Sequence, residues 1–260
     1  MLDKLKQELV NTVHSVISKS VQKMPAAYQD ALHSCVRHNY NLELSLLACA
    51  SSRWCGSTEQ KGMSAAVAAY MLRAGITVHL EVTDFTGVFD DLPQLLDERD
   101  DTLAILAGDG LIALAIEYLA CNGGMHSSRL VSEAVKAVGA SGMLTGLSME
   151  IDRADGVETA VPDGRSLSEL YSGQLERFAS HGGALLAGAS DMMLDDAALI
   201  GVLTGRAKFL VRKAECSEDR NEKKDLAFQA GTLIEQAETI AGHKPNAVLF
   251  NSIMYLSDFL

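Results

Sequence analysis

The sequence predicts an all-α protein, folded as one helical bundle of about ten helices around a central cavity. Apolar residues recur at helical spacing along nearly the whole chain, and the alternation typical of strands is almost absent. Only 4 prolines and a 5% aromatic fraction also favour a bundle over a sandwich or barrel. With 260 residues, of which 48% are hydrophobic, the chain can bury one large core. We therefore expect a single domain over residues 1–260.

Local signals place the helices of the first half. Leu5, Leu9 and Val13 share one face of the first helix. Pro25 favours a helix start because its fixed φ suits the first turn. Ser57 or Thr58 can cap a later helix, which Gly75 would end. The expected helices of this half cover residues 5–17, 25–38, 42–54, 58–75, 76–91 and 101–121.

The second half shows the same spacing, with longer polar breaks. Asn122-Gly123-Gly124 separates its first helix from the preceding one, and Ser190-Asp191 begins another. The polar stretch Cys216–Asp225 predicts an exposed loop. The expected helices of this half cover residues 127–150, 166–187, 191–216, 222–241 and 245–259.

Charge and cysteine content limit the class of function. The chain has 22 Lys and Arg against 34 Asp and Glu, and its net charge of -12 argues against general nucleic-acid binding. No zinc-ligand spacing occurs among the 5 cysteines, which we expect to be small buried residues in a reducing compartment. The apolar stretches look too short to span a bilayer, and no signal peptide is evident. We therefore expect a cytoplasmic protein without a transmembrane segment.

Four stretches, whose order along the chain matches the family, resemble the trans-isoprenyl diphosphate synthase (polyprenyl synthetase) family. Asp101–Cys121, DTLAILAGDGLIALAIEYLAC, is similar to the family segment around "LAGD". Phe89–Pro93, FDDLP, resembles the start of the first aspartate-rich motif. Gly142–Gly146, followed by Glu150, resembles "GMxGGQxxD", and Leu185–Arg206 follows the pattern that precedes the second aspartate-rich motif.

The resemblance implies an isoprenoid-synthase-type helical domain with a deep cavity. In active members, two aspartate-rich motifs face each other and hold Mg²⁺, which neutralises the diphosphate of an allylic substrate. Lys and Arg side chains hold the phosphates. Members dimerise through long helices, including the one that matches Asp101–Cys121.

This chain departs from the family pattern at the cavity mouth. The basic "GGKRxRP" element is expected near residues 46–56, where Arg53 is the one cation. Asp90, Asp91 and the displaced Asp97 remain from the first aspartate-rich motif and could still hold one Mg²⁺. The loop that follows is shortened, and Arg99 is its remaining arginine.

The two other catalytic elements are altered as well. The Gln of "GGQxxD" is lost and its Asp becomes Glu150, which with Asp152 could form a weakened acid pair. The second aspartate-rich motif falls on Phe209–Ser217, with Lys213 and Ala214 in place of its leading acids. A lysine repels a metal ion, so a cluster of Mg²⁺ ions has too few ligands. Arg53, Arg99, Glu150 and Asp152 stay candidates for substrate binding.

Other polar residues are less strongly indicated as functional. Asp109 of "LAGD" is expected to be a structural polar residue within the bundle. Asp195-Asp196 is interpreted as helix-dipole acids in the first turn of their helix. Among the histidines, only His79, near Asp84, has a plausible pocket position.

Three functions follow from the resemblance and its gaps. The first is a non-catalytic or regulatory subunit, a pseudoenzyme that pairs with a motif-complete synthase or with itself. The second is an active Mg²⁺-dependent prenyltransferase or terpene-synthase-like enzyme that uses Asp90 and Asp91. The third is a protein that binds a prenyl chain or another hydrophobic ligand.

Overall fold

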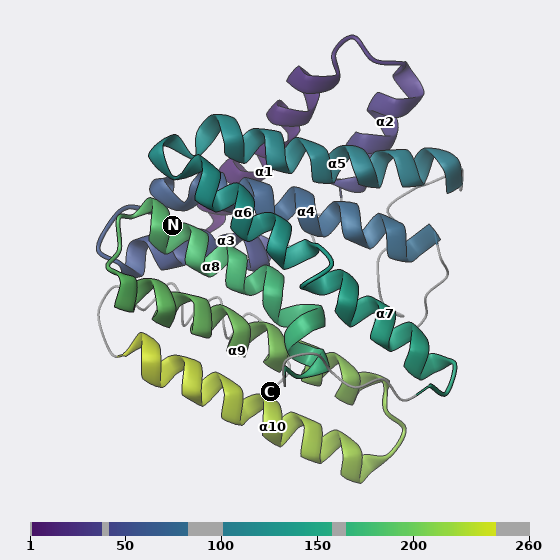
Figure 1. The fold of residues 1–260 in the computed structure, drawn as a ribbon, viewed down its shortest axis with the longest axis vertical. Coiled ribbons are helices and arrows are strands. Elements are labelled where there is room, and N and C mark those ends of the chain that lie inside the picture. The colour runs from purple at the N-terminus through teal and green to yellow at the C-terminus, as the bar shows by residue number, and fades with distance from the viewer. Residues whose placement is uncertain (1, 38–41, 83–100, 158–164, 243–260) are drawn as a thin grey trace.

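The computed structural model describes residues 2–37, 42–82, 101–157 and 165–242, and the regular elements within these ranges are all helical. The predicted all-α fold is confirmed. In Figure 1 the helices form stacked layers, with α10 along one edge of the bundle and α5 across the opposite part, next to α2. The α-helices are α1 (Leu2–Val21), α2 (Ala26–Cys35), α3 (Leu42–Trp54), α4 (Met63–Val82), α5 (Asp101–Asn122), α6 (Ser127–Val138), α7 (Met143–Ala154), α8 (Gln174–Leu186), α9 (Asp191–Cys216) and α10 (Arg220–Ala241).

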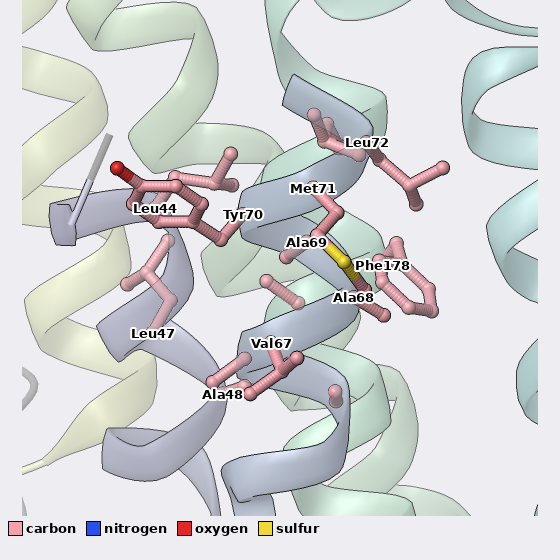
Figure 2. Close-up of a cluster of buried hydrophobic side chains, with 14 of the residues drawn as sticks. Leu44, Leu47, Ala48, Val67, Ala68, Ala69, Tyr70, Met71, Leu72 and Phe178 are labelled. Atoms are coloured by element: carbon pink, nitrogen blue, oxygen red, sulfur yellow. The ribbon is translucent and has the colours of Figure 1, made fainter. Parts of the chain in front are cut away.

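The core lies where α3, α4 and α8 pack together. Figure 2 shows Ala48 of α3, Ala68 of α4 and Phe178 of α8 in one apolar cluster, and all three are fully buried. Small side chains at these contacts let the helix axes approach closely. Gly183 of α8 lies against the Ala48 carbonyl of α3, where an added Cβ would collide with backbone atoms.

One predicted helix boundary is wrong, because the glycine expected to end the helix lies at a helix–helix contact instead. Gly75 was expected to end a helix, yet α4 runs through it from Met63 to Val82. A Cβ at Gly75 would lie 2.8 Å from the carbonyl oxygen of Gly108 on α5. Gly75 therefore permits the α4–α5 contact. The expected helix over residues 76–91 is the end of α4, and residues 83–91 lie outside the described part.

Two further boundaries differ from expectation. The helix expected over residues 127–150 is split at Gly139–Gly142, because this Gly-Ala-Ser-Gly segment is a poor helix former. α10 begins at Arg220, inside the expected loop, because the Asp219 side chain accepts a hydrogen bond from Asn221 N at 2.7 Å. The cap at Ser190, which starts α9, is confirmed by its 3.5 Å hydrogen bond from Met193 N.

α8 is preceded by a π-helical turn, η4 (Glu169–Gly173). Leu170, Tyr171 and Ser172 of this turn are buried. Each π turn contains one residue more than an α turn, and such turns are frequent at functional sites. Here the turn places Ser172 on the wall of the interior cavity described below.

The cysteines only partly follow the expectation of burial. Cys35 and Cys49 are buried, and burial raises the pKa of each thiol to about 12. Cys55 is half-buried, whereas Cys121 and Cys216 are exposed. No disulfide joins cysteines among the described residues.

α5 is an apolar helix with much of its surface uncovered. Its buried strip, which includes Ala104, Leu111 and Leu119, faces the bundle. Two helical segments are long and apolar enough to cross a membrane, by length and composition alone: Glu59–Val82 and Asp101–Asn122. The most apolar 18-residue stretch is 89% buried in the first segment and 33% buried in the second. The expectation that apolar stretches are too short is therefore wrong on length, and the absence of a transmembrane segment stays a prediction.

A buried histidine between α6 and α8 predicts pH-dependent stability. Burial lowers the pKa of His181 from 6.5 to about 4, and Arg177 and Arg129 act in the same direction, while Glu133 opposes them. Between pH 6.5 and 4 the unfolded chain binds a proton that the folded chain excludes. The free energy of unfolding therefore falls as the pH drops through this window, by up to roughly 3 kcal/mol.

Urea unfolding at several pH values between 7 and 4 measures this loss, and His181→Gln is the matched variant. We expect the Gln variant to show a shallower decline over the same window. Equal declines for the wild type and the variant would contradict the assignment to His181.

Candidate functional site

The interior of the bundle holds a small polar cavity where α3, α4, η4, α8 and α9 meet. Its volume is about 30 Å³, room for about two water molecules. We call it the interior cavity. Its polar lining consists of Glu43, Arg73, Ser172, Glu176, Lys208 and Arg212.

A buried ion pair closes this cavity between α4 and α8. Arg73 Nη2 lies 3.2 Å from Glu176 Oε1 and 3.4 Å from Oε2, with the two side chains 9% and 5% exposed. The Nε atom of Arg73 is also buried, with no hydrogen-bond partner among the described residues. Charged groups that are this deeply buried depend on each other for stability.

The α9 side of the interior cavity is basic. Lys208 and Arg212 both line it, and Lys208 Nζ lies 3.5 Å from Glu43 Oε2 on α3. Tyr171 lies close to this group: burial raises the pKa of its hydroxyl, while the charges of Arg73 and Arg212 oppose that rise. Lys213, the next residue of α9, instead lies 3.9 Å from Glu222 on α10.

This donor set does not fit a magnesium cluster. Mg²⁺ prefers carboxylate oxygens, whereas the α9 wall presents lysine and arginine. Among the described residues, no group of three or more His, Cys, Asp and Glu side chains is placed to hold a metal ion. Asp90, Asp91, Asp97 and Arg99 lie outside the described residues, so binding of one Mg²⁺ by these acids stays a prediction.

The structure separates the predicted substrate-binding residues that it describes. Glu150 on α7 is 6% exposed, lies 3.5 Å from Arg153, and acts to raise the pKa of the nearby Tyr171 hydroxyl. Asp152, on the same helix, is half-buried. Arg53 lies ten residues along α3 from Glu43, about 15 Å from the interior cavity, and its partner is Glu59 at 3.7 Å. A role for Arg53 in substrate binding stays a prediction.

Sequence reasoning missed the central role of Arg73. Its ion pair joins residues 103 positions apart, and a lone arginine in an apolar helix gives no local sign of its partner. The one available signal was a charged residue inside the otherwise apolar run from Ala65 to Ile76, because a buried charge requires a partner.

A second, larger pocket lies between α4, α5, α6 and α7. It has a volume of about 560 Å³ and is lined mainly by aliphatic side chains, among them Ile76, Ile112, Val138 and Leu147. We call it the apolar groove. Its size falls in the range of small-molecule sites. The pocket position predicted for His79 is confirmed, since His79 lines this groove.

Asp109 is not the interior polar residue that was expected. Its side chain is 66% exposed, lines the apolar groove, and lies 3.3 Å from His79 Nε2. The α5–α4 packing explains this position, because the adjacent Gly108 takes the buried place against α4.

The face of α5 directed away from the bundle carries exposed apolar residues together with the exposed Asp109. Ile105 and Leu106 are 46% and 52% exposed, and Ala113 and Ala120 are exposed on the same side. We call these four residues the outer face of α5. Met125, just after α5, is 92% exposed. Exposed apolar residues that gather on one helix can mark an interaction site.

Comparison of sequences finds relatives among plant prenyl diphosphate synthases. No family model matches the chain. Geranylgeranyl pyrophosphate synthase 11 (chloroplastic, Arabidopsis thaliana) is 33% identical over 108 residues, 39% of this chain and 30% of the relative. Geranylgeranyl pyrophosphate synthase 9 from the same plant is 27% identical over 213 residues, 75% of this chain and 52% of the relative. The matches thus span about half of these relatives or less.

Comparison of structures finds the same kind of protein. An FPP/GFPP synthase from Zymomonas mobilis aligns with a TM-score of 0.80 at 19% identity, over 98% of each chain. A mint heterotetrameric geranyl pyrophosphate synthase mutant aligns at 0.69 and 20% identity, over 96% of this chain and 98% of the other. The geranyl diphosphate synthase small subunit from Antirrhinum majus aligns at 0.67 and 18% identity, over the same shares. These likenesses establish the fold.

The order of the sequence motifs, the plant relatives and the shared all-helical fold agree with one another. The chain is similar in sequence to plant geranylgeranyl pyrophosphate synthases and shares the fold of trans-isoprenyl diphosphate synthases.

Proposed function

We propose that this chain is a non-catalytic subunit of a prenyl diphosphate synthase assembly, which pairs with a motif-complete synthase through the outer face of α5. The observation that carries the proposal is the interior cavity, closed by Arg73 and Glu176 and bordered by Lys208 and Arg212. Prenyl transfer needs room for an allylic chain and carboxylates for Mg²⁺. The α9 wall of the interior cavity presents Lys208 and Arg212 rather than carboxylates, and its volume of about 30 Å³ is too small for such a chain.

The outer face of α5 supports the partnership half of the proposal. An exposed Ile105-Leu106 pair on a long helix loses water contact when a second helix covers it. Two structural relatives are a heterotetrameric geranyl pyrophosphate synthase and a geranyl diphosphate synthase small subunit. A different, motif-complete chain would cover the apolar residues of this face. It would also supply the carboxylates that hold Mg²⁺. A homodimer is the alternative occupant, and a cytoplasmic location stays a prediction.

Co-expression with a tagged, motif-complete geranylgeranyl pyrophosphate synthase tests this. We expect this chain to co-purify in a fixed ratio, and Leu106→Glu to reduce recovery at least about tenfold, because it buries a charge in an apolar contact. Phe228→Glu is the matched control, since Phe228 is 74% exposed on α10, along the opposite edge of the bundle (Figure 1). Equal recovery of both variants would contradict the assignment of this face.

Assays of the isolated chain address the catalytic half. With Mg²⁺, isopentenyl diphosphate and allylic diphosphates, we expect no turnover. Turnover that disappears in Asp90→Ala would instead favour the second candidate, an active Mg²⁺-dependent enzyme that uses Asp90 and Asp91.

A third function, binding of a prenyl chain or another hydrophobic ligand, is favoured by one observation. The apolar groove has a volume of about 560 Å³ and a mainly aliphatic lining. The groove and the outer face of α5 are neighbours on that helix, since Ile105 lies two turns before Ile112 of the groove.

A further inference from the structure

Two histidines from neighbouring helices meet outside the sites described above. His14 on α1 and His33 on α2 have their Nδ1 atoms 3.4 Å apart. The ring centroids are 5.6 Å apart and the ring planes are inclined by 15°, so the two Nδ1 atoms lie between the rings and face each other. Both rings are half-buried, which leaves part of the pair open to solvent. Neither ring lines the interior cavity or the apolar groove.

The pairing of α1 with α2 determines this contact. A short turn over residues 22–25 joins the two helices (Figure 1). His14 lies seven residues before the end of α1, and His33 lies seven residues after the start of α2. Equal distances from a short turn place two residues side by side in an antiparallel helix pair. Val13 and Leu32, which precede the two histidines, are 1% and 0% exposed, so the core holds both backbones in place.

The separation of the two nitrogen atoms matches the ligand spacing around a transition-metal ion. Zn²⁺ binds histidine nitrogen at about 2.0–2.1 Å in tetrahedral geometry, which places two such ligands about 3.4 Å apart. Imidazole nitrogen suits Zn²⁺, Ni²⁺ and Cu²⁺, whereas Mg²⁺ prefers oxygen ligands. Because the Nδ1 atoms face each other directly, each ring has to turn slightly about its Cβ–Cγ bond to aim at the ion. The pair then supplies two ligands, and water completes the coordination.

A serine hydroxyl supports one of the two rings. Ser18 Oγ, one turn along α1 from His14, lies 3.3 Å from His33 Nε2. A ring that coordinates a metal ion through Nδ1 carries its proton on Nε2, where the Ser18 hydroxyl can accept it. Histidine ligands in metal sites are commonly held by such a bond at the second ring nitrogen, which fixes the orientation of the ring. The contact therefore keeps Nδ1 of His33 directed toward His14.

We propose that His14 and His33 bind a divalent transition-metal ion, such as Zn²⁺ or Ni²⁺, which links α1 to α2. The two nitrogens come together only when the helices pair, so the ion stabilises the folded chain. The site differs in its ligand chemistry from the acids Asp90, Asp91 and Asp97, which could hold Mg²⁺. The inference is independent of the proposed subunit role.

Isothermal calorimetry with Ni²⁺ at neutral pH, in excess Mg²⁺, tests the proposal on the full chain. We expect Ni²⁺ to bind despite the Mg²⁺, because imidazole is a poor ligand for that ion. His14→Ala and His33→Ala should each weaken this binding at least about tenfold, because one imidazole alone cannot chelate the ion. His126→Ala is the matched control, since His126 is a half-buried histidine of the turn η2 (Gly124–His126), and binding should stay unchanged.

Two further measurements use the link between the helices and the wild-type side chains themselves. Ni²⁺ at ten times its Kd should raise the Tm of the wild type by about 2–4 °C and leave the Tm of the two alanine variants unchanged. Diethyl pyrocarbonate modifies accessible histidine nitrogens, and mass spectrometry of peptides locates the label. We expect Ni²⁺ to protect His14 and His33 together in the wild type, and to leave His126 as reactive as before. This labelling does not depend on the folding of any variant.

The proposal is overturned if Ni²⁺ does not bind, if Mg²⁺ competes with it on equal terms, or if neither histidine is protected from the label. Weakened binding in only one of the two alanine variants would show a contact with a single histidine, and would overturn it as well. None of these outcomes bears on co-purification with a synthase, so failure here and failure of the proposed function can be told apart.

Discussion

Replacing Arg73 with leucine is expected to lower the free energy of unfolding by about 3–5 kcal/mol. The change leaves Glu176, only 3% exposed, without the cation 3.2 Å away that compensates its burial. Glu176 must then either keep an uncompensated charge or take up a proton, and both cost stability. This would be a large fraction of the stability of an ordinary domain.

The double variant Arg73→Leu/Glu176→Leu separates the charge from the packing. Replacing both members of a buried ion pair with apolar groups is often neutral or stabilising, so we expect recovery to within about 1 kcal/mol of the wild type. Arg53→Leu is the matched control, because the Arg53 side chain is 45% exposed and pairs with such an exposed member contribute at most about 1 kcal/mol. Urea unfolding followed by circular dichroism gives all three values. A double variant as unstable as the single one would show that packing, not charge, sets the cost.

Gly183→Ala is expected to destabilise the protein by at least about 3 kcal/mol. The new methyl group would collide with the Ala48 carbonyl group of α3. Because the obstacle is backbone, no side-chain rotation relieves the collision, and α3 and α8 must move apart at the centre of the core. Well-packed interiors resist such displacement.

Gly231→Ala provides the opposite result from the same chemical change. Gly231 lies within α10, and an added Cβ there has no neighbour within 4 Å. Alanine has the higher helix propensity, so we expect a gain of about 0.5–1 kcal/mol. Thermal unfolding of both variants measures the contrast. If Gly183→Ala lowered the free energy of unfolding by less than an ordinary surface substitution does, the close packing of α3 against α8 would be contradicted.

The helices could be predicted from sequence where local chemistry determines them. The 42–54 helix has the predicted bounds, and Ser190 caps α9 as expected, because helical periodicity and caps involve neighbouring residues. Gly75 was misread as a helix end because a glycine that terminates a helix and one that permits a close contact look alike in sequence. Only the partner, Gly108, distinguishes them.

The candidate site was less predictable, for a related reason. The resemblance shows in the sequence that Lys213 and Ala214 replace carboxylates. The ion pair at the interior cavity could not be predicted in this way, because Arg73 and Glu176 come from helices far apart in the chain. The contact between His79 and Asp109 at the apolar groove likewise requires α4 and α5 to lie side by side. Such arrangements depend on tertiary packing and have no local pattern.

The π turn at Glu169–Gly173 also constrains how the chain can change in length. Removing a single residue would allow an uninterrupted α-helix, but everything on the N-terminal side would rotate by about 100° relative to α8. Leu170, now fully buried, would then swing away from the core. Evolution can therefore exchange side chains in this segment far more readily than it can shorten it by one position.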